Sequence, residues 1–292
     1  MKVAYCIQCH KNTKILREFI NILSVKNDIY VHVDKKSDID DFKEYKDKVI
    51  FIEDRVNVTW AEVSQIYATI NSLKEAMKKW KYDYIFLVSG DCLPTKSDDQ
   101  IRMFLSENKG KEFIGIEKNF NKSLIEDRLK YKYPSIYYKK DKNKLDKLRI
   151  LIRDRLKLNK KNKYFDSLPP LYKGCNWFGL TGNACMHILD YIQSNDIYLK
   201  AFRNSIYGDE VFFQTIIMNS IYKNNIYNYD NENDDNKMAL RYIDWKSGPQ
   251  FPRILNEEDF ESIKKTDTII ARKFDESLDI DKYRTYFGIK KL

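Results

Sequence analysis

The first 117 residues alternate short strand-like runs with amphipathic helical patterns. The clearest helical pattern covers 62–79, where apolar residues recur at three- and four-residue steps behind a capping box formed by Thr59 and Glu62. Strands separated by helices of this length predict βαβ units and an α/β fold with a mostly parallel central sheet flanked by helices. The strand-like runs, rich in Val, Ile, Tyr and Phe, cover 3–9, 29–33, 49–53, 84–89 and 113–117.

Parallel sheets bind ligands at the carboxyl ends of their strands, which directs attention to two acidic positions. Asp34 follows the run 29–33, and Asp91 follows the run 84–89. A carboxylate at a strand end often binds a ribose or a base edge. For Asp34 an ordinary turn is an equally good interpretation.

The pattern changes after residue 117. Residues 118–164 are rich in Lys, Asn and Tyr, and they contain a helical stripe of Leu145, Leu148, Ile152 and Leu156. We then expect a strand over 172–180, a helix over 184–192, a helix beginning at Asp209 and Glu210, and a mobile polar loop over 228–237. No repeat or domain boundary is evident, so the sequence predicts a single domain over 1–292 with a basic helical insertion at 118–164.

The net charge of +9 is concentrated in one segment. Residues 139–163 hold twelve Lys or Arg and three Asp, which gives +9 and leaves the remainder of the chain neutral. A basic segment suggests nucleic acid as a partner, but this one carries Leu and Ile on one face and no aromatic residues. A solvated charged helix and a contact with an anionic membrane surface stay open as alternatives.

Several site classes are disfavoured by the sequence. The five cysteines are odd in number and unevenly spaced, which favours free thiols, and the haem-like spacing of Cys6, Cys9 and His10 falls in a predicted core strand. Walker, Gly-x-Gly-x-x-Gly and HExxH motifs are missing, and the three histidines are scattered. No apolar run approaches the ~18 residues of a membrane span, so we expect a soluble, cytoplasmic protein.

Seven ordered motifs carry a resemblance to a known family. Together they resemble the core-2/I-branching β-1,6-N-acetylglucosaminyltransferases and their peptide O-xylosyltransferase relatives, glycosyltransferase family 14, and the chain looks like a bacterial member. The motifs are HVDKKS (32–37), TWAEVS (59–64), YIFLVSGDCLPTKS (84–97), KGCNWFGLT (173–181), YGDEVFFQT (207–215), LRYIDW (240–245) and ARKFD (271–275).

The resemblance implies a GT-A-type nucleotide-sugar fold, an inverting reaction and a UDP-sugar donor. It places nucleotide binding in 1–117 and the acceptor and catalytic half in 165–292. It also implies that no divalent metal or other cofactor is needed, and the single carboxylate of Asp91-Cys92-Leu93 agrees with this. In the family the leaving UDP is stabilised by an Arg and a Lys, which fall on Arg253, with Arg272 as the alternative, and on Lys273. Asp34 matches the acidic residue of the nucleotide pocket.

The catalytic base of the family falls on Glu210. One carboxylate is what an inverting transfer needs, although Asp209 and Glu210 could equally be a helix cap and first-turn acid. We expect Asp209 at the N-cap and Glu210 as the first helical residue. The acceptor or sugar side is assigned to Trp245, Asp91 and Asp209.

One of these assignments has an alternative, and another departs from the family pattern. Trp245 could instead be a core aromatic residue. Asp91 departs from the family pattern, because it precedes Pro94 by three residues instead of two. Trp60 and Trp177 are predicted to be packing residues.

These observations predict an inverting, metal-independent glycosyltransferase that moves a sugar, GlcNAc first, from a UDP-sugar onto a hydroxyl of a glycan in β-linkage. UDP-xylose or another UDP-sugar is the alternative donor, and a basic nucleic-acid-binding protein is the remote alternative. The acceptor would be a lipid- or protein-linked glycan of bacterial glycan biosynthesis. Peripheral contact with the anionic inner membrane face stays open.

Overall fold

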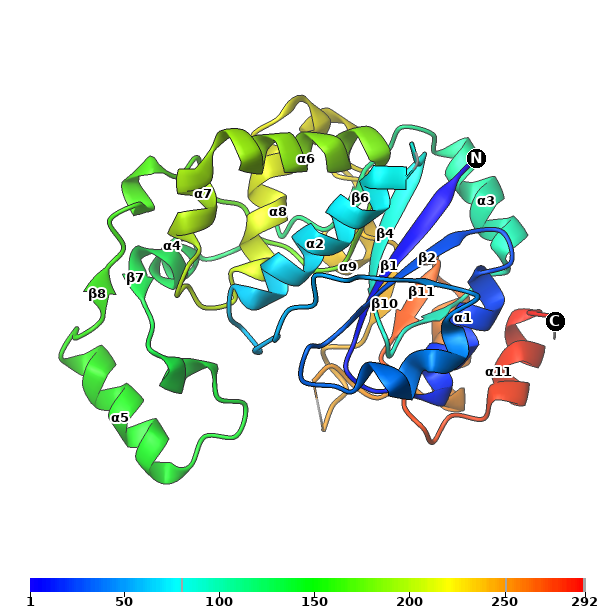
Figure 1. Ribbon diagram of the computed structural model, residues 1–292, viewed down its shortest axis with the longest axis horizontal. Coiled ribbons are helices and arrows are strands. Elements are labelled where there is room, and N and C mark those ends of the chain that lie inside the picture. The colour runs from blue at the N-terminus through cyan, green and yellow to red at the C-terminus, as the bar shows by residue number, and fades with distance from the viewer. Residues whose placement is uncertain (80, 250, 291–292) are drawn as a thin grey trace.

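A six-stranded sheet forms the centre of the molecule, in the order β3-β2-β1-β4-β9-β6 (Figure 1). The computed structural model describes residues 1–79, 81–249 and 251–290. Strands β1, β2, β3 and β4 are parallel, whereas β9 is antiparallel to both β4 and β6. The mostly parallel α/β sheet predicted from the sequence is thereby confirmed. The strands are β1 (Val3–Cys9), β2 (Asp28–Val33), β3 (Ile50–Phe51), β4 (Tyr84–Ser89), β6 (Phe113–Ile114) and β9 (Phe178–Thr181).

Helices cover both faces of this sheet, so its central strands are buried on both sides. On β1, Tyr5 and Ile7 join one apolar core, and Ala4 and Cys6 join the other. This explains why β1 is a continuous apolar run instead of an alternating one. The first core is covered by α1 (Lys14–Leu23), α3 (Asp98–Glu107), α10 (Phe260–Lys264) and α11 (Ile280–Phe287), and the second by α2 (Ser64–Lys79), α6 (Gly182–Ser194), α7 (Asp196–Ala201) and α8 (Asp209–Met218).

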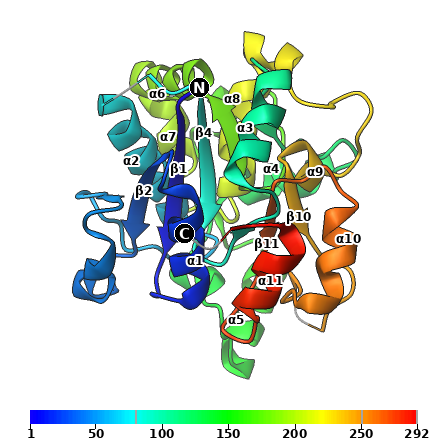
Figure 2. The same cartoon turned by 90° about the vertical axis from the view of Figure 1, so that its right-hand side faces the viewer.

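A second, three-stranded sheet packs beside the first, near α10 and α11 (Figure 2). It pairs β10 (Arg241–Ile243) in parallel with β11 (Ile270–Arg272), and β11 antiparallel with β5 (Leu93–Pro94). Arg241 joins the two sheets, because its buried guanidinium donates to the carbonyl oxygens of Leu87 at 3.0 Å and Phe178 at 3.3 Å. The last paired residues of β4 and β9 are Phe86 and Gly179, and the two carbonyls belong to the next residue on each strand.

The insertion at 118–164 is anchored at its base and protrudes at its tip (Figure 1). The buried side chain of Asn162 donates to the carbonyl oxygens of Leu129 and Ala201, at 2.8 and 2.7 Å. The predicted helix over 145–156 is confirmed as α5 (Lys144–Arg155). The insertion also contains α4 (Lys122–Lys130), β7 (Tyr131–Lys132), η2 (Ser135–Tyr138) and β8 (Lys160–Lys161). The remaining elements of the chain are α9 (Asp235–Met238), η1 (Ile39–Tyr45), η3 (Phe165–Ser167), η4 (Ile221–Asn225) and η5 (Glu257–Asp259).

Several predicted boundaries were wrong. The runs 49–53 and 113–117 form only the two-residue strands β3 and β6. The run 172–180 enters the sheet only at Phe178, because upstream N–H groups are used elsewhere: Tyr172 donates to the Thr215 hydroxyl and Gly174 to the Glu210 carbonyl. The region 228–237, predicted to be a loop, ends in the short helix α9.

The start of α2 was also predicted wrongly. The helix begins at Ser64, where the Glu62 carboxylate accepts the Ser64 N–H and the Ser64 hydroxyl accepts the Thr59 N–H. The expected capping box between Thr59 and Glu62 is therefore replaced by bonds that converge on Ser64. The division into 1–117, 118–164 and 165–292 stays a prediction, and its last two residues, 291 and 292, lie outside the described residues.

The five cysteines are free thiols, as predicted. Cys6 and Cys9 are buried in β1, so their spacing reflects a core strand. Within the described part of the chain, no helix is long and apolar enough to cross a membrane.

Truncating Arg241 should destabilise the fold. We expect Arg241→Ala to lower the free energy of unfolding by about 3–5 kcal/mol, because it leaves a cavity and removes both hydrogen bonds between the sheets. Chemical denaturation measures the change. The matched control Arg203→Ala, at an exposed position, should cost about 0.5 kcal/mol or less. Equal costs for the two variants would contradict the structural role of Arg241.

Candidate functional site

Asp34 lies at the carboxyl end of β2, where its backbone N–H donates to the Cys9 carbonyl at 2.8 Å. Its carboxylate accepts the Lys36 N–H at 2.9 Å and lies 3.5 Å from the Lys36 ammonium group. The side chain therefore closes a local turn, which is the simpler of the two interpretations offered by the sequence. Its role in nucleotide binding stays a prediction.

Asp91 forms a two-pronged ion pair with Arg272. The guanidinium Nη2 lies 3.1 Å from Oδ2 and Nε lies 3.3 Å from Oδ1, while the Ser89 hydroxyl donates to Oδ1. Burial alone would raise the pKa of the Asp91 carboxyl, but the charge of Arg272 and these hydrogen bonds hold it below its ordinary value. Because both oxygens are occupied, Asp91 acts first as an anchor for Arg272.

The Arg272 guanidinium makes a second contact, with an aromatic ring. Its guanidinium lies over the ring of Trp177, 5.0 Å from the ring centre. Trp177 is buried, which confirms it as a packing residue. Two of the three guanidinium nitrogens of Arg272 thus bind Asp91, which favours Arg253 as the diphosphate ligand, and the choice between the two stays a prediction.

Lys273 and Arg253 lie on adjoining segments beside this ion pair. The Phe274 N–H donates to the Asp91 carbonyl at 3.0 Å, and the Leu255 N–H donates to the Lys273 carbonyl at 2.8 Å. The Arg253 guanidinium is 3.4 Å from Asp259 and 3.8 Å from Glu258, which are loose ion pairs. The structure thus brings the two predicted diphosphate ligands to one edge of the small sheet.

Trp245 lies two residues after the end of β10, next to Asp244, whose carbonyl accepts the Arg253 N–H at 2.9 Å. Its side chain is 50% exposed, which excludes the core-aromatic alternative. Trp60 is exposed to the same extent, so its prediction as a packing residue was wrong. It stands edge-on to Tyr207 with 5.2 Å between ring centres.

Glu210 lies in the first turn of α8, at the amino end of the helix. The N-cap is Gly208, so Asp209 is the first helical residue and the predicted cap was wrong by one position. The Glu210 side chain is 33% exposed, with Oε2 2.8 Å from Arg128 and 3.9 Å from Lys173. Among the described residues none donates a hydrogen bond to Oε1, so this oxygen can accept one from a ligand.

The two cations around Glu210 were missed from the sequence. Arg128 comes from α4 in the insertion, a segment outside the family motifs, and its guanidinium also lies 5.1 Å from the Tyr207 ring centre. Lys173 additionally pairs with Glu117. No spacing pattern links residues 82 positions apart, so only the folded chain reveals the contact between Arg128 and Glu210.

Close packing of two glycines places Lys173 beside Glu210. A Cβ atom on Gly174 would lie 1.8 Å from the Gly115 carbonyl oxygen, so only glycine permits this approach. The Gly174 N–H donates to the Glu210 carbonyl at 2.9 Å. The same segment continues to Trp177, which underlies Arg272, and it therefore connects the surroundings of Glu210 with those of Asp91 and Lys273.

Asp209 has an unusual environment for a carboxylate. Burial, and next the charge of Glu210, raise its pKa to about 7, and its Oδ1 is buried without a hydrogen-bond partner. Both protonation states are therefore accessible near neutral pH. The predicted contact of Asp209 with a sugar stays a prediction.

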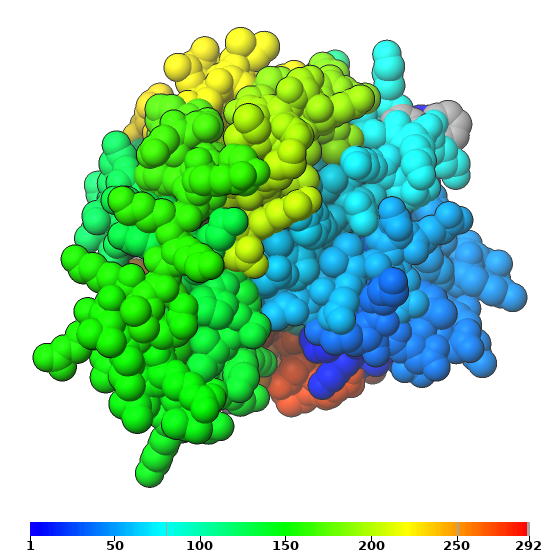
Figure 3. Space-filling model, turned by 60° about the vertical axis from the view of Figure 1, so that its left-hand side comes forward, coloured from blue at the N-terminus to red at the C-terminus, as the bar shows by residue number. Residues whose placement is uncertain are grey.

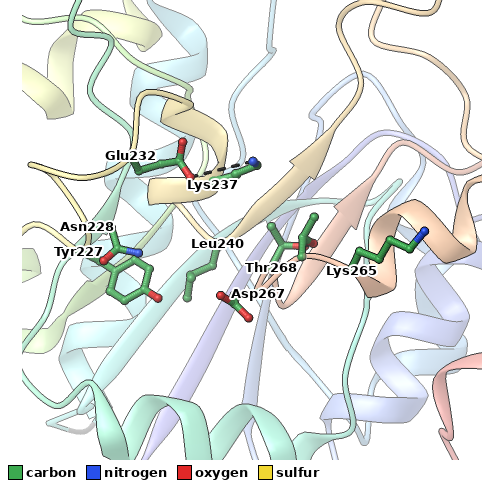
Figure 4. A pocket seen from close by; sticks show the side chains of 9 residues that line it. Tyr227, Asn228, Glu232, Lys237, Leu240, Lys265, Asp267 and Thr268 are labelled. Atoms are coloured by element: carbon green, nitrogen blue, oxygen red, sulfur yellow. Dashed lines mark hydrogen bonds and ion pairs between the residues drawn. The ribbon is translucent and has the colours of Figure 1, made fainter.

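A hollow of about 190 Å³ lies at the opposite edge of the small sheet (Figure 4). Leu240 and Thr268, which line it, precede β10 and β11, whereas the candidate residues follow those strands. It is lined by Tyr227, Asn228, Glu232, Lys237, Leu240, Lys265, Thr266, Asp267 and Thr268. None of the predicted site residues contributes to it. The described residues also contain no group of three His, Cys, Asp or Glu that could hold a metal ion, and metal independence stays a prediction.

The fold and the site define an α/β protein that gathers cations, carboxylates and an exposed indole beside the carboxyl ends of its strands. Residues 3–264 match the family model of the Core-2/I-Branching enzyme. The chain belongs to this family, which confirms the resemblance deduced from the motifs. The enzymes of the family are glycosyltransferases.

Curated relatives agree with this placement. Xylosyltransferase 2 of Rattus norvegicus and of Homo sapiens are each 23% identical over 136 residues, which cover 43% of this chain but 16% of the relative. The chain thus spans a small part of the length of these relatives. Among solved structures, the apo form of mouse Xyloside xylosyltransferase 1 aligns with 75% of this chain and 83% of its own, at 13% identity and a TM-score of 0.32.

The raised pKa of Asp209 predicts a pH-dependent stability difference. Asp209 binds its proton more tightly in the folded protein than in the unfolded chain. The resulting stabilisation is complete below about pH 4 and is lost as pH rises through about 7. Asp209→Asn lacks this loss, so its stability relative to the wild type should improve by on the order of 1–2 kcal/mol between pH 5 and pH 8. Urea unfolding at the two pH values measures it. A difference that does not vary with pH would contradict the assignment.

Proposed function

We propose that this protein is an inverting glycosyltransferase with a GT-A-type fold, which transfers a sugar from a UDP-sugar to a hydroxyl of a glycan in β-linkage. The observation that carries the proposal is the arrangement of Glu210. Arg128 and Lys173 hold one carboxylate oxygen on a helix terminus and leave the other available.

Glu210 would serve as the general base. In a single displacement the acceptor oxygen attacks the anomeric carbon from the face opposite UDP and forms the glycosidic bond. The bond between the anomeric carbon and the phosphate oxygen breaks, and UDP leaves with the electron pair. The hydroxyl proton passes to Oε1 of Glu210, while Arg128 fixes the carboxylate through Oε2.

Lys273 and Arg253 would stabilise the leaving diphosphate without a metal. Negative charge grows on the phosphate oxygens as the bond breaks, and fixed cations stabilise it with little reorganisation. The ion pair of Asp91 with Arg272 would act indirectly, by holding the strand end that carries Lys273. Asp34 would contribute to the nucleotide pocket from the end of β2.

The donor is proposed to be UDP-GlcNAc, with UDP-xylose as the second candidate. The resemblance of the motifs to the core-2/I-branching N-acetylglucosaminyltransferases supports the first, and the names of the curated relatives support the second. On the acceptor side, the exposed indole of Trp245 offers a face on which a sugar ring can stack. We further propose a role in bacterial glycan assembly, in the cytoplasm, with a lipid- or protein-linked glycan as acceptor.

Replacing the base should abolish turnover but preserve donor binding. We expect Glu210→Gln to lower the rate of UDP release by a factor of about 10² or more with either donor, measured in EDTA, because the amide cannot accept the proton. The matched control is Glu117→Gln, which also loses a carboxylate next to Lys173. Undiminished turnover in Glu210→Gln would exclude it as the base. Turnover that needs an added divalent metal would exclude metal independence.

Replacing Lys273 should weaken UDP binding directly. We expect Lys273→Met to raise the Kd of UDP by about tenfold or more, since it removes one fixed charge from the diphosphate. Isothermal titration provides the measurement. Lys265→Met is the matched control, because Lys265 lines the hollow of Figure 4 at the other edge of the sheet. A larger increase in the Kd of UDP for Lys265→Met than for Lys273→Met would indicate that the nucleotide binds in that hollow.

A further inference from the structure

The protruding helix α5 presents its apolar side chains to solvent. Leu145, Leu148, Leu151, Ile152 and Leu156 are each between 44% and 62% exposed. The first four lie on the helix and Leu156 is its C-cap, so they form one outward surface, here called the α5 surface. Figure 3 shows the insertion, in green, as a lobe that projects from the body of the molecule. Contiguous exposed apolar surface of this kind marks an interaction site.

The two acidic residues of α5 contact the neighbouring segment of the insertion instead. Asp146 is 3% exposed, pairs with Lys139 at 3.0 Å and accepts the Asn143 N–H in a capping box. Asp154 accepts the Tyr137 hydroxyl at 2.6 Å. Except for the half-buried Ile150, the apolar side chains of α5 therefore point to solvent, which is the reverse of an ordinary surface helix, whose apolar stripe faces the core. Polar contacts hold α5 in place and keep its apolar side chains outward.

Charge around the α5 surface is almost entirely positive. The two acidic residues of α5, Asp146 and Asp154, are the ones engaged by Lys139 and Tyr137. The basic residues that border the surface are exposed, namely Lys144, Lys147, Arg149, Arg155 and Lys157. The complementary partner is anionic at its surface and apolar just beneath it.

We propose that the α5 surface docks the protein onto an anionic lipid bilayer. The leucine and isoleucine side chains would enter the boundary between head groups and acyl chains, while the flanking Lys and Arg contact lipid phosphates. A second copy of this chain is disfavoured because it would bring like charges together. Nucleic acid offers phosphates but no apolar layer for these side chains.

The docked helix would place the bilayer near the candidate base. The Lys142 ammonium lies 5.7 Å from the Trp60 ring centre, Trp60 contacts Tyr207, and Arg128 lies between Tyr207 and Glu210. An acceptor anchored in the bilayer would thus be presented beside Glu210. This last step rests on the proposed function, whereas membrane docking itself does not.

Vesicle co-sedimentation of the full chain tests the proposal without reference to activity. The probes are phosphatidylcholine vesicles with and without phosphatidylglycerol. The wild type should bind the anionic vesicles, less at high salt, and the triple variant Leu148→Ser/Leu151→Ser/Ile152→Ser should lose at least about tenfold in affinity. The matched control is Met103→Ser, at a 60% exposed position of α3. Circular dichroism verifies that each variant is folded.

A second variant tests the charge separately. Arg149→Gln/Arg155→Gln keeps the apolar side chains and should weaken binding to anionic vesicles at low salt. Equal binding by the wild type and the triple variant would overturn the proposal, as would equal binding to both kinds of vesicle. If the wild type does not bind vesicles, two other partners can be tested. Self-association or binding to a short duplex DNA that the triple variant loses would assign the α5 surface to that partner.

Discussion

The ion pair between Asp91 and Arg272 is the constraint on which the candidate site depends. It joins Asp91, two residues after the end of β4 in the central sheet, to the last residue of β11 in the small sheet, and the Trp177 ring packs against the Arg272 guanidinium. Since Lys273 follows Arg272 and its carbonyl binds the segment of Arg253, this one contact sets the position of both cations proposed for the diphosphate. A partly buried charge pair costs desolvation, which its two-pronged geometry and the Ser89 hydroxyl offset.

The surroundings of Glu210 are assembled from three distant segments of the chain. Its own helix supplies the carboxylate, the insertion supplies Arg128, and the segment that packs on Gly115 supplies Lys173. The insertion therefore has two structural roles. Its base contributes to the candidate site through α4, and its tip carries the outward apolar helix α5.

The sequence predicts those structural elements that a local pattern of residues determines. Strands β1 and β4 were located to the residue, because continuous apolar runs are buried on both faces. The ordered motifs led to Glu210 and Lys273, whose catalytic and binding roles stay predictions. Two-residue strands such as β3 and β6 could not be delimited, since tertiary pairing defines them. Arg128 was missed because its contact with Glu210 is long-range, and the ion pair of Asp91 with Arg272 was missed for the same reason. The contact of Asp91 with a sugar stays a prediction. The apolar stripe of α5 was predicted, but its outward orientation follows from the contacts of Asp146 and Asp154 with the neighbouring segment.

We propose that the carboxyl ends of β2, β4 and β11 bind a UDP-sugar for transfer to an acceptor activated by Glu210. A crystal structure of the protein with UDP bound tests it most directly. We expect the diphosphate against Lys273 and Arg253, the uridine toward Asp34, and the space for the sugar between the β-phosphate and Glu210. UDP bound in the hollow lined by Lys237 and Lys265, at the amino ends of β10 and β11, would contradict it.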